Sequence, residues 1–410
     1  MRNALSNMRL FRRRQPWEQN LLVLWFGNFM AGVAFSLIMP FMALYIDTLG
    51  NFTQLQLNFW SGLTFSSTFL VTAIVSPLWG RLADRRGRKL MLLRASLGMA
   101  FVLGSMGLVN SVYQLVALRL LQGVFSGYIS NANALIATSV PREQSGKALG
   151  TLTTGNVSGT LLGPLLGGLI ADLFGYRATF FVTGGILLLV FLLTFFLVHE
   201  TFTPIAKTDQ VSGGQILKQL KYPHVIIGMF VTTLIIQASN NSISPILSLY
   251  VRQLLGGHGK VALISGIIAS IPGIATLIAA PRFGALGDRI GTQKVLMAGL
   301  AFGILVYIPQ AFVQNAWQLG GLRFLVGIVD AALLPQVQTL LAKYSPHQNA
   351  GRIFSYNQSF QAMGNMIGPL IGSTVSGVFG YSSIFFATSL LIIVNFVWVR
   401  YSTKELQEEA

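Results

Sequence analysis

The chain of 410 residues is 53% hydrophobic and only 10% charged, and its formal net charge is +16. Soluble proteins carry about 25% charged residues, so this composition indicates an integral membrane protein. The absence of cysteine excludes disulfides and thiolate chemistry, and the four histidines show no metal-ligand spacing, so we expect no metal and no cofactor.

The N-terminal segment is basic, and the apolar stretch behind it has no charged residue from Gln19 to Ile46. That stretch is too long for the short apolar core of a secretory signal. It therefore predicts a retained first helix with a positively charged lead-in.

Further stretches of similar length follow along the whole chain. A membrane-spanning helix needs about 20 predominantly apolar residues. Glycine and proline inside such a stretch do not exclude a helix, because neighbouring helices and waters can satisfy the freed backbone groups. The sequence predicts an all-α membrane protein with twelve spans: Leu21–Tyr45, Phe59–Leu82, Leu90–Val109, Tyr113–Ser139, Lys147–Ala171, Thr179–Val198, Val225–Tyr250, Val261–Leu286, Val295–Val313, Trp317–Ala342, Ser355–Val378 and Ser382–Tyr401.

The two halves of the sequence resemble each other at an offset of 204 to 205 residues. Leu118-Arg119 and Gly123, for example, recur as Leu322-Arg323 and Gly327. Such an offset is typical of a duplicated helical unit. We expect two pseudo-symmetric six-helix halves, residues 1–198 and 225–410, around a central cavity, with a cytoplasmic linker over 199–224.

The cations are distributed unevenly between the two sides of this arrangement. With both termini on one side, that side holds 23 of the 28 lysine and arginine residues, and the other side holds Arg177, Arg252 and Lys260. Cytoplasmic loops are enriched in cations. The split predicts cytoplasmic termini, and it explains the basic charge without nucleic-acid binding.

A short cationic turn, Gly80–Lys89, carries five of these residues between two apolar runs. Its spacing of glycines, acid and base recurs in Gly284–Lys294. Asp84 could cap the next helix or pair with Arg88, and a charged turn can be a topology anchor alone. Because the whole pattern occurs twice, we expect a further role.

These features together resemble the major facilitator superfamily, over essentially the whole chain. The turn Gly80–Lys89 resembles that family's loop between helices 2 and 3, and Leu118–Gly123 resembles its fourth-helix motif with a membrane arginine. The run Gly159–Gly168 and the position of Pro40 resemble the twelve-helix drug/proton antiporters within the family.

The resemblance implies two devices. A cytoplasmic latch would hold the halves in one state and release them in the other; its residues would be Gly80, Asp84, Arg85, Gly87, Arg88, Asp288 and Arg289. A tightly packed, kinked fifth helix would seal the outer side; its residues would be Gly159, Gly163, Pro164, Gly167 and Gly168. Small residues at intervals of four also favour close helix packing by themselves.

One carboxylate lies far inside a predicted span. Asp330 is near mid-bilayer, and Arg323 lies two helical turns away on nearly the same face. Ionisable groups at that depth are costly and are usually functional. We expect Asp330, with Arg323 and its repeat partner Arg119, to couple proton movement to transport. The alternatives are a fixed hydrogen bond for Asp330 and outer-interface snorkelling for the two arginines.

Polar and aromatic side chains inside the spans form a candidate substrate cavity. An apolar cavity with a few polar groups suits amphipathic molecules. The candidates are Asn28, Phe29, Asn133, Gln237, Asn240, Gln336 and Gln358. Some of these amides could serve only to tie helices together.

The leading hypothesis is a proton-driven exporter of amphipathic drugs or other toxic small molecules. The alternative is a proton-coupled importer of a defined nutrient, such as a sugar or organic acid, and the Gly159–Gly168 pattern favours export. We expect a multi-pass protein of the bacterial inner membrane that works as a monomer. Its partners would be its small-molecule substrate, protons and lipid, and not nucleic acid. The sequence contains no nucleotide-binding loop and no large soluble domain, so nothing in it supports an enzyme.

The predicted orientation can be tested on this cysteine-free chain. A cysteine at Arg86 or Lys218 should react with a membrane-impermeant maleimide only from the cytoplasmic side. A cysteine at Lys260 should react only from the outside, which makes it the internal control. Labelling of Arg86→Cys in intact cells would contradict the topology.

Overall fold

The computed structural model describes residues 16–200, 222–345 and 350–404, and these residues form helices and connections without a β-strand. The first helices in chain order are α1 (Pro16–Leu37), α2 (Met42–Asp47), α3 (Gln54–Arg86), α4 (Arg88–Met106), α5 (Val112–Phe125), α6 (Tyr128–Ser139), α7 (Arg142–Phe174) and α8 (Tyr176–Leu197). They are followed by α10 (Pro223–Ser242), α11 (Leu247–Leu254), α12 (Val261–Ile290), α13 (Thr292–Tyr307), α14 (Ala316–Tyr344), α15 (Ala350–Phe379) and α16 (Ser383–Ser402). Short 3₁₀ helices cover Met39–Phe41 and Ile308–Phe312.

Most of the predicted spans are confirmed. Ten helical stretches of the described residues are long and apolar enough to cross a membrane. One of the two remaining predicted spans, Ser355–Val378, lies inside the continuous helix α15, whose sequence is richer in glycine, serine and amides. The all-helical membrane fold predicted from the sequence is therefore confirmed.

The predicted span over 113–139 is present as two helices, α5 and α6, and not as one continuous helix. The helix is interrupted between α5 and α6 at Ser126 and Gly127, and Gly127 has a φ of +107° that favours glycine. Arg94 and Trp79 take the carbonyls that the break frees. Arg94 Nη2 donates to Ser126 O over 2.6 Å, and Trp79 Nε1 donates to Val124 O over 2.8 Å. Side chains of neighbouring helices thus stabilise a break that periodicity alone does not reveal.

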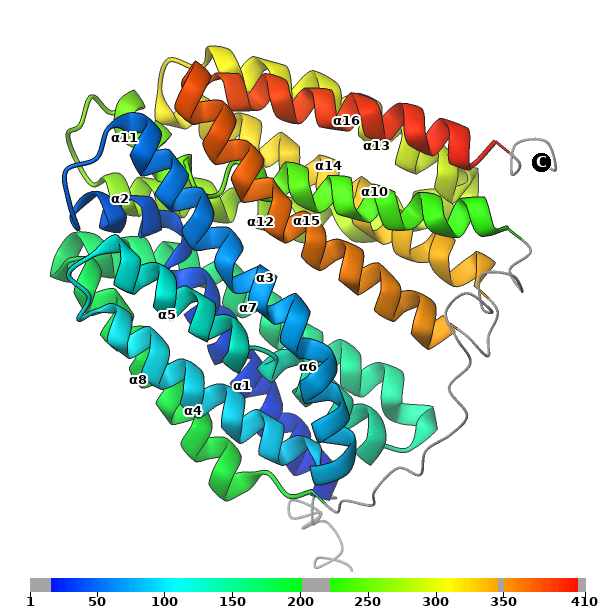
Figure 1. Ribbon diagram of the computed structural model, residues 1–410. Helices are drawn as coiled ribbons and strands as arrows, with labels where there is room; N and C mark the ends of the chain where they lie inside the picture. The colour runs from blue at the N-terminus through cyan, green and yellow to red at the C-terminus, as the bar shows by residue number, and fades with distance from the viewer. Residues whose placement is uncertain (1–15, 201–221, 346–349, 405–410) are drawn as a thin grey trace, which may run out of the picture.

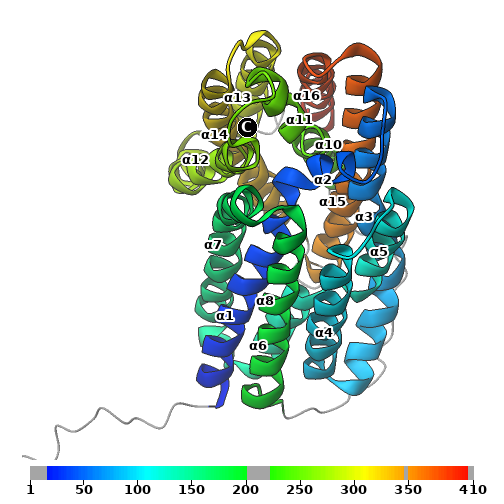
Figure 2. The same ribbon diagram turned by 90° about the vertical axis from the view of Figure 1, so that its left-hand side faces the viewer.

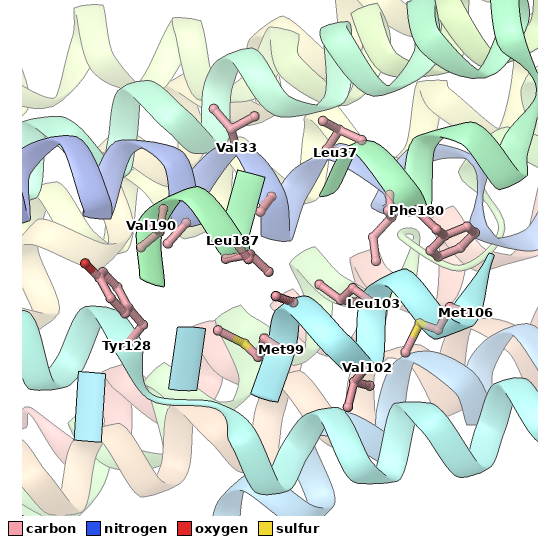
Figure 3. Close-up of a cluster of buried hydrophobic side chains, with 14 of the residues drawn as sticks. Val33, Leu37, Met99, Val102, Leu103, Met106, Tyr128, Phe180, Leu187 and Val190 are labelled. Carbon is pink, nitrogen blue, oxygen red and sulfur yellow. The ribbon is translucent and has the colours of Figure 1, made fainter. Parts of the chain in front are cut away.

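The helices form two bundles, each with its own apolar interior (Figure 1). One cluster of buried side chains comes mainly from residues 24–198 and the other from residues 226–399. In the first cluster, side chains of α4 and α8 such as Leu103 and Leu187 lie between these two helices, and Val33 of α1 belongs to the same cluster (Figure 3). The linker predicted over 199–224 falls largely on 201–221, outside the described residues, so the domain boundaries stay a prediction.

Equivalent contacts recur in the two bundles at the offset seen in the sequence. Thr72 Oγ1 donates to Gly123 O over 3.4 Å, and Thr276 Oγ1 donates to Gly327 O over 2.8 Å. Both glycines press against the backbone of the helix that carries the threonine. The internal repeat is therefore a repeat of packing as well as of residues.

Glycines bring two pairs of helices into backbone contact. On α7, a Cβ added at Gly159, Gly163 or Gly167 would collide with a backbone carbonyl of α1. On α15, the same holds for Gly364, Gly368 and Gly372 against α10. Small residues in this pattern let helix backbones approach closely, so α1 with α7 and α10 with α15 form tight pairs.

This close approach predicts opposite effects for two glycines of one helix. Gly167→Ala should lower the free energy of unfolding by about 1–3 kcal/mol because its Cβ would overlap the Leu37 carbonyl. Gly150→Ala is the matched control, since nothing lies within 4 Å of its Cβ; there alanine should stabilise the helix by roughly 0.5–1 kcal/mol. Thermal unfolding in detergent would measure both, and equal melting temperatures would contradict the packing.

Candidate functional site

The two bundles meet along two pairs of helices. α3 lies against α15, and α7 lies against α12. In the first pair, Asn58 Nδ2 donates to Ser376 Oγ over 3.3 Å and Ser66 Oγ donates to Met366 O over 2.7 Å. Such single hydroxyl and amide bonds are weak enough to break and re-form.

The second pair uses part of the predicted fifth-helix motif. Gly266 of α12 presses against the Pro164 carbonyl, and Gly168 of α7 presses against the Ala262 carbonyl. Gly159, Gly163 and Gly167 instead contact α1, within their own bundle. The motif thus has two faces: one builds the first bundle, and the other contacts the second.

Carboxylates reinforce this contact at the helix ends. Asp172 Oδ2 accepts from Leu263 N over 2.8 Å, near the start of α12. Arg252 Nη1 donates to Asp47 Oδ2 over 2.6 Å, between α11 and α2. Positions 47 and 252 are 205 residues apart, so equivalent sites of the repeat carry opposite charges and pair with each other across the two bundles.

The hydrogen bonds between described residues of the two bundles lie between one end of the molecule and the middle of the helices, where Ser66 donates to Met366 O and Ser270 donates to Leu161 O. We call this end, which holds Asp47 and Arg252, the closed face. The opposite end, which holds the turns at Gly87 and Gly291, is the loop face. Figure 1 shows the bundles meeting near α2 and α11 and diverging toward the loop face, and Figure 2 shows α2 next to α11 where they meet.

Toward the loop face, the sides of these helices that contact the other bundle become exposed. One or two turns beyond the contacts, Thr153 of α7, Leu277 of α12 and Gln358 of α15 are exposed. Apolar and polar side chains are therefore uncovered on these helix faces. The bundles are in contact at the closed face and separated toward the loop face, and we call the region between them the open space.

Asp330 lies at the midpoint of α14, fourteen residues from each end. Its side chain is half-buried, and its Oδ1 accepts from Asn240 Nδ2 of α10 over 2.8 Å. Asn240 Oδ1 accepts in turn from the hydroxyl of buried Tyr307 over 3.1 Å. The repeat-equivalent position of Asp330 is Ser126, where the fourth span breaks. At this position of the repeat, the first bundle therefore has a helix break and the second has a carboxylate.

The structure does not bring the three predicted coupling residues into contact. Arg323 is buried, its Nε has no hydrogen-bond partner among the described residues, and it forms no ion pair within 4 Å with Asp330. Arg119 is fully buried rather than snorkelling to an interface, and its Nε donates to Thr64 O over 3.0 Å. Gln122 and the ring of Phe65 complete its surroundings, all inside the first bundle.

The predicted latch turn is a sharp junction between two helices. Gly87, with a φ of +94°, ends α3 and begins α4. The α4 N-terminus is capped by Glu200, whose carboxylate accepts from Arg88 N over 2.8 Å and from Lys89 N over 2.7 Å. The side chain of Asp84 lies outside the described residues, and nothing lies within 4 Å of a Cβ at Gly80.

The second turn repeats this junction at Gly291, whose φ is +102°. Asp288 and Arg289 are exposed there, as Arg85 is in the first turn. Among the latch side chains that the structure describes, Arg85, Asp288 and Arg289 form no hydrogen bond or ion pair with a described residue of the other bundle. The latch stays a prediction.

The seven predicted cavity residues differ in accessibility. Gln358 is exposed, and Phe29, Asn133, Gln237 and Asn240 are half-buried. Asn28 and Gln336 are buried, and Gln336 Nε2 donates to Phe283 O over 2.9 Å, which ties α14 to α12. Neither therefore borders an open space in this conformation, and a cavity common to all seven stays a prediction.

Three features of the site escaped the sequence analysis. The Asp47–Arg252 pair had a signal, because opposite charges occupy repeat-equivalent positions. The cap by Glu200 and the hydroxyl of Tyr307 had none, since each partner is remote in sequence. Among the described residues, no group of three or more His, Cys, Asp or Glu side chains could hold a metal ion.

Comparison with known proteins gives a consistent result. A family model described as Major Facilitator Superfamily matches residues 24–264 and 229–409. The chain is 53% identical over 399 residues to the multidrug resistance protein MdtG of Dickeya zeae, covering 96% of this chain and 98% of that protein. It is 55% identical over 382 residues to MdtG of Serratia proteamaculans, covering 93% of each.

Solved structures share the fold at low sequence identity. A bacterial homolog of the human lysosomal transporter Spinster, in an inward-facing and unoccupied conformation, has a TM-score of 0.79 at 14% identity, over 95% of this chain and 98% of that one. A mutant of the nucleoside transporter NupG has a TM-score of 0.74 at 14% identity, over 95% of this chain and all of that one.

The Asp47–Arg252 pair predicts how the closed face responds to charge changes. Arg252→Asp should open it about two- to fivefold more often, because a partly exposed ion pair contributes about 0.5–1 kcal/mol; the side chains are 37% and 31% exposed. Asp47→Arg combined with Arg252→Asp should restore closure. Distances between spin labels at Asn51→Cys and His258→Cys would report opening. A double variant as open as the single one would contradict the pair's role.

Proposed function

The chain belongs to the major facilitator superfamily, and from this premise we propose that it is a proton-driven exporter of amphipathic small molecules. Membership, together with the MdtG relatives, makes it a multi-pass membrane transporter of the secondary class and not an enzyme. The proposal concerns the driving ion, the direction and the substrate class.

Alternating access is supported by the asymmetry of the two faces. The bundles touch at the closed face through few polar groups and separate toward the loop face. The tight pairs α1 with α7 and α10 with α15 keep each bundle together. A rocking motion about the α3–α15 and α7–α12 contacts would open one face as the other closes.

The orientation of the open space follows from charge. The loop face carries the cationic turn around Gly87, and cytoplasmic sides are cation-rich. We propose that the loop face is cytoplasmic, that both chain termini lie there, and that the membrane is the bacterial inner membrane. The conformation seen here is then inward-facing, ready to load substrate from the cytoplasm.

Asp330 is the observation that carries the proposal of proton coupling. Among the acids whose side chains are described, it alone lies far from a helix end. A carboxylate at mid-membrane is costly, so a carboxylate found there usually has a function. Its hydrogen-bond partner is the amide of Asn240, which is held in turn by the Tyr307 hydroxyl, rather than a fixed ion pair, so its hydration and proton occupancy can change as the bundles move. Protonation would then favour one conformation over the other.

The substrate class is supported by the surfaces that face the open space. Exposed apolar side chains such as Leu277 and exposed amides such as Gln358 lie on the facing helices. Such a mixed surface suits molecules with an apolar body and a few polar groups. The relatives' description as multidrug resistance proteins agrees with this class and with export.

The test is Asp330→Asn in proteoliposomes. We expect uphill, proton-driven efflux across a panel of amphipathic drugs to be lost, at least tenfold below wild type, because asparagine cannot carry the proton. Downhill exchange and drug binding should persist, which is the internal control for folding. Asp330→Glu should retain part of the coupled activity, since it keeps a titratable group.

If Asp330 has only a fixed structural role, the opposite result is expected. Asparagine is nearly isosteric and still hydrogen-bonds to Asn240, so a structural Asp330 would tolerate it. Proton-driven efflux by Asp330→Asn at the wild-type rate, over the accessible pH range, would reject proton coupling through this residue.

A further inference from the structure

Three polar side chains from three helices form a hydrogen-bonded chain inside the second bundle. The hydroxyl of Tyr307, at the end of α13, donates to Asn240 Oδ1 on α10. Asn240 Nδ2 donates to Asp330 Oδ1 on α14. The two bonds are 3.1 and 2.8 Å long, and Tyr307 is buried. This series of hydrogen bonds therefore directs an N–H donor of Asn240 at the Asp330 carboxylate.

Tyr307 fixes the direction in which the amide of Asn240 faces. An amide has an acceptor at one end and donors at the other, and the tyrosine hydroxyl occupies the acceptor end. If the amide turned over, the hydroxyl hydrogen would lose its acceptor, because the described residues offer it no other hydrogen bond. A buried donor without a partner is costly, so the orientation that points N–H at Asp330 is favoured.

This orientation has a chemical consequence for the carboxyl group. A hydrogen bond donated to a carboxylate favours the ionised form, whereas a protonated carboxyl needs an acceptor for its own hydrogen. Asn240 can offer that acceptor only if its amide rotates to point Oδ1 at Asp330, which would break the hydrogen bond from Tyr307. In the conformation with an open loop face, the pair therefore assists loss of the proton.

Few other titratable groups influence Asp330. Those that interact with it electrostatically are Arg323 on its own helix and Tyr307 on α13. Among the helices packed against α14, α10 carries no lysine, arginine or acid, and its one histidine, His224, is the second residue of the helix, sixteen residues before Asn240. The charged residues of the others lie toward the loop-face ends of those helices: Arg282, Asp288 and Arg289 on α12, Lys294 on α13 and Arg352 on α15. The Asn240 amide is thus the direct hydrogen-bond partner of Asp330, and it favours the ionised form of the carboxyl group over the protonated form.

We propose that Asn240 and Tyr307 are positioning residues that promote release of the proton from Asp330 while the loop face is open. The inference rests on the proposed function, which makes Asp330 the proton carrier. It adds the group that favours release on the loading side, where an exporter exchanges its proton for substrate.

The test is a pH titration of the purified full-length protein in lipid nanodiscs, followed by infrared difference spectroscopy of protonated carboxyl groups. Loss of a band in Asp330→Asn assigns it to Asp330. Asn240→Ala should raise the pH at which that band half disappears, corresponding to about tenfold tighter proton binding, since a hydrogen bond to a charged group is lost. Tyr307→Phe keeps the ring and should move the midpoint in the same direction by less.

Asn241→Ala is the matched control. Asn241 is the next residue of α10, but its Nδ2 donates to Asn365 Oδ1 of α15 over 2.9 Å rather than to Asp330. Its titration midpoint should equal that of wild type. An equal shift in Asn240→Ala and Asn241→Ala would mean general loosening of α10 and would overturn the proposal.

The positioning role of Asn240 and the proton coupling of Asp330 are rejected by different results. If Asn240→Ala and Tyr307→Phe titrate as wild type while Asp330→Asn lacks coupled transport, the positioning role is wrong and the proposed function stands. If Asp330→Asn transports uphill like wild type, the proposed function is wrong. If Asn240→Ala does not fold, Tyr307→Phe decides the question, because an unmoved midpoint rejects the role of the hydroxyl.

Discussion

The constraint on which the rest of the structure depends is the approach of helix backbones at glycine. Gly167 of α7 and Gly372 of α15 each lie so close to a carbonyl of the neighbouring helix that no side chain fits. Inside a membrane, helix association cannot rely on the expulsion of water from apolar surface, so close packing of small residues contributes much of the attraction. These contacts make each bundle a unit and leave the surfaces between the bundles as the place where the molecule can change shape.

The surfaces between the bundles combine close glycine contacts, at Gly168 and Gly266, with single polar bonds. Ser66, Asn58 and Ser270 each contribute a single hydrogen bond across the interface, and one partly exposed ion pair closes the end. Each of these contributions is small and can be exchanged for water or for contacts at the other face. Helix α7 takes part in both the packing within its bundle and the contact between the bundles. One face packs tightly on α1, and another face, with Pro164 and Gly168, meets α12.

The polar interior of the second bundle adds a second constraint. Asn240 and Asn241 are adjacent on α10, yet one is bonded to α14 and the other to α15. α15 is also the helix through which this bundle meets α3. The same turn of α10 therefore contacts both the proposed proton site and the helix that borders the open space. This arrangement gives protonation of Asp330 a short physical route to the interface between the bundles.

The amino-acid sequence by itself determined the membrane class, the helical fold, the repeat and the depth of Asp330. These follow from apolar length, charge distribution and spacing, which are local or additive properties. Tertiary structure decided the break at Gly127, because Arg94 and Trp79 reach the freed carbonyls from other helices. It also decided that Asp330 pairs with Asn240 instead of Arg323, and that Glu200 caps α4. Partners 90 to 112 residues apart meet only after the helices pack, so no local pattern in the sequence specifies them.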